Sequence, residues 1–139
     1  MDLLNGFRTE LDARRRGGRW HLDAELVYAC RDGTKITVPA GFDTDFASVP
    51  RLPLVFLCAG DAAHEAAVVH DFLYRAQTLS RRRADAIFRE AMACTPCCEP
   101  WWRRWLMWVG LRLFGWAAWR SNRRVLMARR RALERATLT

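Results

Sequence analysis

The sequence has no run of about 18 residues that is both apolar and free of charge. Its N-terminus also lacks the basic region and apolar stretch of a signal peptide. The first absence argues against a membrane-spanning helix, and the second predicts synthesis in a cytoplasm. Lysine is nearly missing too, because Lys35 is the only one among 23 basic residues. Arginine therefore supplies almost all the positive charge, which favours phosphate binding and stacking on aromatic rings.

Cysteines are few and odd in number. There are five, with no secretory signal, so we expect reduced thiols rather than a disulfide framework. Cys94, Cys97 and Cys98 lie close together, but no second pair follows at a spacing that would complete four zinc ligands. The cluster is therefore interpreted as small residues at a helix turn.

The composition that remains is that of a folded chain. It has 139 residues, of which 51% are apolar and 27% charged, with only 8 glycines and 5 prolines. These values exclude disorder and collagen-like repeats, and they predict a single domain over residues 1–139. The net charge of +8 points to an anionic partner.

The N-terminal part is predicted to be β-structure. Residues 19–38 alternate apolar and polar side chains around a glycine-containing turn at 31–34, which is typical of a hairpin. The stretch Arg14–Gly18 before it is predicted to be flexible and basic. After it, prolines interrupt residues 39–60, so we expect an irregular loop there and assign 19–60 to hairpin and loop.

Two helices are predicted over residues 61–94. Asp61 is a suitable N-cap for a helix running to about Gln77, and Ser80 is suited to cap a second one. The second helix has an apolar stripe formed by Ala84, Ile87, Phe88, Ala91 and Met92. Only a few residues connect them, so the helices should be antiparallel neighbours. The predicted fold class is therefore α+β, with the hairpin and loop packed on this helix pair.

A tryptophan- and arginine-rich helical tail is predicted over residues 99–136. Six of the seven tryptophans follow Pro100, and Arg112 is the only charge between Trp105 and Trp119. That stretch is about 22 Å long as a helix, too short to span a bilayer. Two interpretations remain: an interfacial helix on an anionic phospholipid membrane surface, or core packing, which we expect for at least half of the tryptophans. The arginines are also compatible with nucleic acid, but no frame for sequence-specific DNA binding is present.

One constellation is suited to hydrolysis. His70 and Asp71 are adjacent, Tyr74 follows one turn later, and Asp85 lies on the next predicted helix. His70 would be the general base, Asp85 would orient its ring, and Asp71 would hold a cation. The alternative is a buried, satisfied histidine without catalysis. Both interpretations place the Asp85 carboxylate about 2.6 to 3.2 Å from a His70 ring nitrogen.

The loop before these helices is rich in oxygen. Asp43, Thr44, Asp45 and Ser48 suit either a hard cation or a self-bonded turn, two interpretations that the sequence leaves open. We predict that Asp45 points toward the His70–Asp71 pair.

Two resemblances follow from these motifs. Asp61-Ala62-Ala63, His70-Asp71-Phe72-Leu73-Tyr74 and Ala84–Phe88 resemble the pattern of compact phospholipases A2, including those of parvovirus capsids. This resemblance implies His70 as general base, Asp71 as Ca²⁺ ligand, and Tyr74 with Asp85 as the network that holds the histidine. The family's glycine-rich calcium loop is not recognisable here.

The second resemblance covers residues 20–119. The segment Phe42–Arg51 is similar to the F-x-T-D-F-A-S-V-P-R signature of a family of small phage and prophage proteins of unknown function. Together the two imply a phage-derived, phospholipase A2-like hydrolase acting on membrane lipid esters. The alternative is a non-catalytic virion or tail-associated protein that binds membranes or phage structural proteins. Either would be made in the bacterial host cytoplasm and act in the virion or at the membrane periphery.

Overall fold

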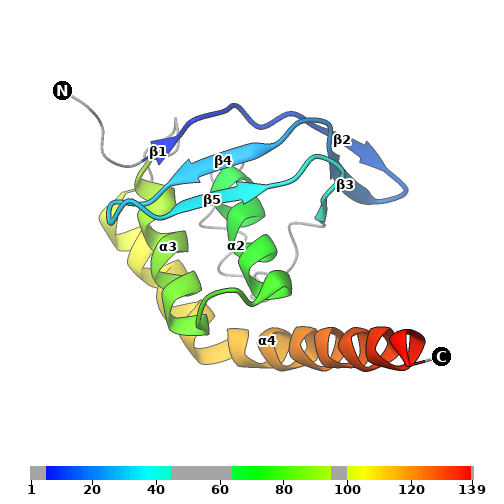
Figure 1. Cartoon of the computed structure of the whole chain (residues 1–139). Helices are drawn as coiled ribbons and strands as arrows, with labels where there is room; N and C mark the ends of the chain where they lie inside the picture. Colours follow the sequence, from blue (N-terminus) through cyan, green and yellow to red (C-terminus); the bar gives the residue numbers. More distant parts are fainter. Residues whose placement is uncertain (1–5, 45–63, 95–99, 139) are drawn as a thin grey trace.

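The computed structural model describes residues 6–44, 64–94 and 100–138, which form an α+β fold of antiparallel strands followed by helices (Figure 1). The predicted fold class is therefore confirmed. The strands in chain order are β1 (Gly6–Phe7), β2 (Ala13–Arg16), β3 (Arg19–Leu22), β4 (Leu26–Ala29), β5 (Lys35–Val38) and β6 (Asp43–Thr44). The helices are α2 (His64–Ala76), α3 (Arg81–Ala93) and α4 (Trp101–Thr137).

The predicted turn at residues 31–34 joins β4 to β5. The two strands pair antiparallel from Leu26 opposite Val38 to Ala29 opposite Lys35. Gly33 has a φ of 86°, a value that favours glycine, and the Asp32 side chain accepts a hydrogen bond from the Thr34 N–H. This hairpin, with β1 on its other side, forms the first three-stranded sheet.

The basic stretch before it is not flexible, which corrects the sequence prediction. Residues 13–16 form β2 and pair with β3, with Arg16 opposite Arg19. Gly17 and Gly18 fill the two-residue turn with φ values of 56° and 81°. Two successive positive φ angles match the right-handed twist of the strands, so the glycine pair makes a tight hairpin.

The arm of the predicted hairpin that precedes the turn at 31–34 is also divided. Its first half, β3, belongs to the second sheet with β2 and β6, whereas its second half, β4, belongs to the first sheet. Asp23, Ala24 and Glu25 have low strand propensity and lie at the break. The alternation of apolar and polar residues therefore continues from one sheet into the other. The sequence pattern does not reveal where the sheet changes.

Helices α2 and α3 lie next to each other, run antiparallel and cover one face of the first sheet (Figure 1). Ser80 is the N-cap of α3 and accepts a hydrogen bond from the Arg83 N–H, as predicted. The predicted cap Asp61 lies outside the described residues. The inward face of α3 is its predicted apolar stripe, and all of its members are buried: Ala84, Ile87, Phe88, Ala91 and Met92.

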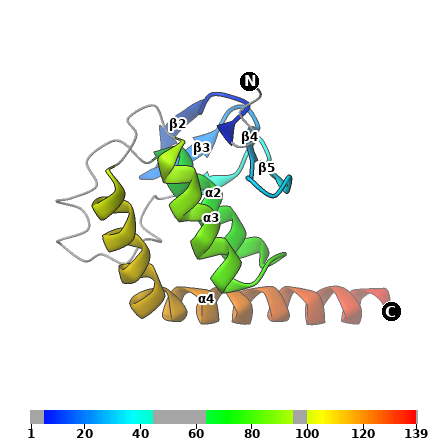
Figure 2. The same cartoon turned by 90° about the vertical axis from the view of Figure 1, so that its left-hand side faces the viewer.

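Helix α4 closes the other side of the helix pair and then projects away from it (Figure 2). Its buried residues are two glycines and two apolar side chains that follow helical spacing: Met107, Gly110, Leu111 and Gly115. None of its six tryptophans is buried, so the expectation that core packing explains at least half of them is wrong. Gly110 and Gly115 allow the close approach of α4 to its neighbours, while Met107 and Leu111 fill the space between them. Trp119 is partly buried and packs edge-to-face on Tyr74, whereas four other indole rings of α4 are exposed.

Candidate functional site

His70 and Asp85 meet across the α2–α3 pair. The His70 Nε2 and Asp85 Oδ1 atoms are 3.1 Å apart, within the predicted range. Both side chains come from the buried faces of their helices, where antiparallel packing brings them opposite each other. The His70 ring also packs against Tyr74 and Phe88, with ring centroids 4.1 and 5.0 Å away. Packing and hydrogen bonding together hold the imidazole in one orientation.

Two further donors reach the same carboxylate. The Tyr74 hydroxyl donates to Asp85 Oδ1 at 2.6 Å, and the Arg112 guanidinium donates to Oδ2 at 3.0 Å. Tyr74 was predicted from the sequence, but Arg112 was not. The sequence does contain a signal for Arg112, because it is the lone charge in an otherwise uncharged stretch of α4. Such a charge needs a partner when it faces the core.

The donors keep Asp85 ionised despite its burial. Desolvation raises the pKa of this carboxyl, but the hydrogen bonds from His70, Tyr74 and Arg112 outweigh it and hold the pKa below its usual range. Burial, followed by the bond to Asp85, raises the pKa of Tyr74, so its hydroxyl stays a neutral donor. An ionised Asp85 must accept from His70, so Nε2 carries a proton, and in a neutral ring the lone pair then lies on Nδ1.

The cluster is closed to solvent. His70 is 1% exposed, and Asp85 and Tyr74 are 0% exposed. The Nδ1 atom of His70 has no hydrogen-bond partner among the residues that the structure describes. This arrangement can orient a general base, and it can equally hold three helices together.

Asp71 lies next to His70 but contacts a cation of the protein. Its carboxylate is 3.0 Å from the Arg75 guanidinium one helical turn later. Arg75 also donates to the backbone carbonyl of Asp43 at 2.6 Å, so it links α2 to β6. Sequence reasoning missed Arg75, although the spacing of four residues from Asp71 is typical of a helix ion pair.

The calcium prediction concerned Asp71 and Asp45. Asp45 lies outside the described residues, as does most of the oxygen-rich loop, so its orientation toward His70 stays a prediction. At Asp71, the guanidinium of Arg75 already binds both the carboxylate and a carbonyl of the preceding strand. The described contacts therefore fit an arginine at this carboxylate better than a metal ion, and we assign no chemical step to calcium.

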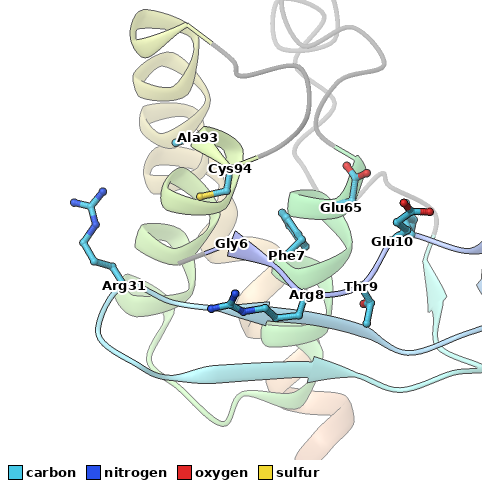
Figure 3. Close-up of a pocket in the computed structure, with 10 residues that line it drawn as sticks. Gly6, Phe7, Arg8, Thr9, Glu10, Arg31, Glu65, Ala93 and Cys94 are labelled. Atoms are coloured by element: carbon cyan, nitrogen blue, oxygen red, sulfur yellow. The ribbon is translucent and has the colours of Figure 1, made fainter. Parts of the chain in front are cut away.

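A separate cavity of about 850 Å³ lies near the start of β1, and Figure 3 shows the residues that line it. Carboxylates of Glu10 and Glu65 lie toward one end of this view, with Arg31 and the Cys94 thiol toward the other. Neither His70 nor Asp85 lines it. The hydrolase prediction consequently rests on the buried cluster and not on this cavity.

Comparison with known proteins gives one family. A family model described as a protein of unknown function, DUF1353, matches residues 20–111. The match includes His70, Tyr74 and Asp85 and ends one residue before Arg112. Neither the curated proteins nor the solved structures give a significant match. The resemblance to phospholipases A2 and the phage signature thus stay predictions.

Proposed function

We propose that this chain, which belongs to the DUF1353 family of proteins of unknown function, is an ester hydrolase in which His70 is the general base. The observation that carries the proposal is the bond from His70 Nε2 to the ionised Asp85, which leaves Nδ1 as the basic nitrogen. The substrate class is the ester of a membrane phospholipid, because the chain is arginine-rich and carries exposed tryptophans on α4.

The chemistry needs one water molecule and the His70–Asp85 pair. As the water oxygen attacks the ester carbonyl, Nδ1 takes the water proton and the ring becomes an imidazolium. Asp85 stabilises that charge through Nε2–H without itself taking the proton. The carbon–oxygen bond of the leaving alcohol then breaks, and Nδ1 returns the proton to the alcohol oxygen. The products are a fatty acid and a lysophospholipid.

The decisive experiment compares His70→Ala with His64→Ala. His64 lies on the same helix, and the hydrogen bonds to Asp85 come from other residues, so it is a matched control. Release of fatty acid from phosphatidylglycerol vesicles should fall about 10²- to 10⁴-fold in the first variant and stay within about twofold in the second. Circular dichroism checks folding, because the loss of one of the three donors to the buried Asp85 costs about 1 to 3 kcal/mol. Folded wild-type protein that binds vesicles and releases no fatty acid at any cation concentration would overturn the hydrolase proposal.

The calcium prediction has its own test in the same assay. With Arg75 already at Asp71, we expect hydrolysis to persist in excess EGTA. Loss of hydrolysis in EGTA, restored by added Ca²⁺ alone, would instead support the calcium prediction.

A second candidate is a non-catalytic protein that binds the membrane surface. The burial of His70 favours it, and so do four exposed tryptophans on α4: Trp101, Trp102, Trp105 and Trp116. Guanidinium groups of Arg103 and Arg120 stack on exposed rings, with their carbons 5.2 and 5.6 Å from the ring centroids of Trp102 and Trp116. Indole rings at headgroup depth beside arginines are typical of interfacial helices. None of the described helices combines the length and apolar character needed to cross a bilayer.

Vesicle flotation distinguishes this candidate. Replacing Trp102 and Trp116 together by alanine should weaken association with anionic vesicles about tenfold or more, because both rings leave water on binding. Leu133→Ala, at an exposed apolar residue near the end of α4, is the control and should change association less than twofold. Equal binding by all three proteins would show that these two indoles do not carry membrane association. No vesicle binding by the wild type would remove membrane association and leave a phage structural protein as the partner to test.

A further inference from the structure

A second, smaller hollow gathers arginines from three parts of the chain. It has a volume of about 390 Å³ and lies between the β4–β5 turn, α3 and the start of α4. Ala86 and Ala93, two turns apart on α3, leave the space open. Charged and aromatic side chains surround it: Arg31, Arg83, Arg89, Glu90, Arg104 and Trp105. Neither His70 nor Asp85 takes part, so an inference here is independent of the hydrolase proposal.

The acidic groups nearby that belong to the described residues are already engaged. Asp32 pairs with Arg83. The Glu90 carboxylate accepts hydrogen bonds from the Tyr28 hydroxyl at 2.9 Å and from the Arg31 backbone N–H at 2.7 Å. Glu90 thus holds the β4–β5 turn against α3, and it does so through neutral donors.

Three guanidinium groups remain without a carboxylate partner among the described residues, those of Arg31, Arg89 and Arg104. The Nε atom of Arg104 is buried and has no hydrogen-bond partner there. Against them stands the single charge of Glu90, so the hollow carries an excess of about two positive charges. Like charges gathered in this way repel each other, and an anion with several oxygens would relieve the repulsion.

Arg89 is held in an orientation suited to such an anion. Its guanidinium carbon lies 4.3 Å from the Trp105 ring centroid and 5.3 Å from that of Trp108. Stacking uses the flat face of the guanidinium and leaves the N–H edges to donate in the plane. The two indoles, themselves in edge-to-face contact at 5.3 Å, restrict the side chain before any ligand binds.

From this geometry we propose that the hollow binds a phosphate group. A doubly charged phosphate monoester matches the excess of positive charge, and planar N–H forks match phosphate oxygens. A volume of about 390 Å³ holds a phosphate together with part of the molecule that carries it. The same monoester occurs in a soluble phosphate ester and in the headgroup of phosphatidic acid.

Calorimetric titration with inorganic phosphate tests the site on the full-length protein. Arg31→Gln and Arg104→Gln, singly and combined, should weaken binding, the double variant about tenfold or more. Arg130→Gln removes the same charge from the exposed end of α4 and should change affinity less than twofold. Arg31 is an exposed turn residue, so its variant keeps the test valid if Arg104→Gln lowers stability.

The vesicle arm identifies the source of the phosphate. If the ligand is a lipid headgroup, the double variant should lose binding to vesicles that contain phosphatidic acid, and free phosphate should compete with the vesicles. If it is soluble, the double variant should lose phosphate binding alone. No phosphate binding by the wild type, or equal weakening by Arg130→Gln, would overturn the proposal, because the second result would mean attraction to total charge only.

Discussion

Asp85 receives hydrogen bonds from two helices other than its own. His70 and Tyr74 reach it from α2, and Arg112 reaches it from α4. A fully buried carboxylate without donors would be protonated or would destabilise the fold by several kcal/mol. With these donors its pKa falls below the usual range, so the carboxylate stabilises the folded state. A single residue therefore serves both the helix packing and the proposed orientation of the base.

The lowered pKa of Asp85 predicts a specific dependence of stability on pH. A carboxyl whose pKa is lower when folded contributes fully above its unfolded value, about 3.9, and loses that contribution as pH falls through the folded pKa. Asp85→Asn should lower the free energy of unfolding by about 3 to 5 kcal/mol at pH 7, because Arg112 loses its buried partner. The difference from wild type should stay constant between about pH 7 and pH 5 and shrink below about pH 4. Urea denaturation across this range measures it, and a difference that persists unchanged at about pH 2.5 would contradict the assignment.

At the scale of the elements, α4 approaches α2 closely because one position carries no side chain. A Cβ atom added at Gly115 would lie 2.6 Å from the Tyr74 hydroxyl oxygen, closer than packed atoms allow. Tyr74 is unable to move aside, since it bonds Asp85 and meets the Trp119 ring edge-to-face at 5.1 Å. Arg81 adds a second link by donating to the carbonyls of Leu111 and Arg112. Gly115 and the Arg81 side chain, which competes for carbonyls of α4, both favour the bend of α4 in Figure 2.

Gly115→Ala should therefore destabilise the protein, although alanine is the better helix former. We expect a loss of about 1 to 3 kcal/mol from overpacking against Tyr74. Ser121→Ala, at an exposed position of the same helix, should gain a few tenths of a kcal/mol from propensity alone. Thermal and urea unfolding of both variants give the comparison. A gain in stability from Gly115→Ala would mean that α4 does not sit against Tyr74.

At the scale of the whole molecule, packing and charge are concentrated in different places. One hydrophobic cluster joins the strands to all three described helices. Residues 127–138, by contrast, are exposed throughout and form the projecting end of α4 (Figure 1). This end carries four arginines and one glutamate, so its role is electrostatic: Arg129, Arg130, Arg131, Glu134 and Arg135.

Deleting residues 128–139 should separate the two roles. The net charge falls from +8 to +5, since four arginines and one glutamate are removed. The free energy of unfolding should change by less than about 0.5 kcal/mol, because residues 128–138 are exposed. Association with anionic vesicles should weaken at about 50 mM NaCl, and the difference from wild type should vanish at about 300 mM, where screening is stronger. Cooperative unfolding lost on deletion would show that this arm supports the core.

The sequence predicted best where the evidence is local. The Ser80 cap, the turn at Gly33 and the apolar stripe of α3 all depend on residues a few positions apart. The contact between His70 and Asp85 was also predictable, because a short connection brings antiparallel helices together and both residues belong to the apolar faces. The strand break at Asp23–Glu25 was not, since alternation of apolar residues is the same within one sheet or across two.

By itself, then, the sequence determined the α+β class, the helix pair and the meeting of His70 with Asp85. Only the tertiary structure decided that Arg112 neutralises Asp85 from α4, that Arg75 meets Asp71, and that four of the six tryptophans of α4 are exposed. The physical reason is how far apart along the chain the residues lie that determine each feature. Caps, turns and helix faces follow from neighbours along the chain, whereas the pairing of a charge and the exposed side of a helix depend on which distant elements pack together.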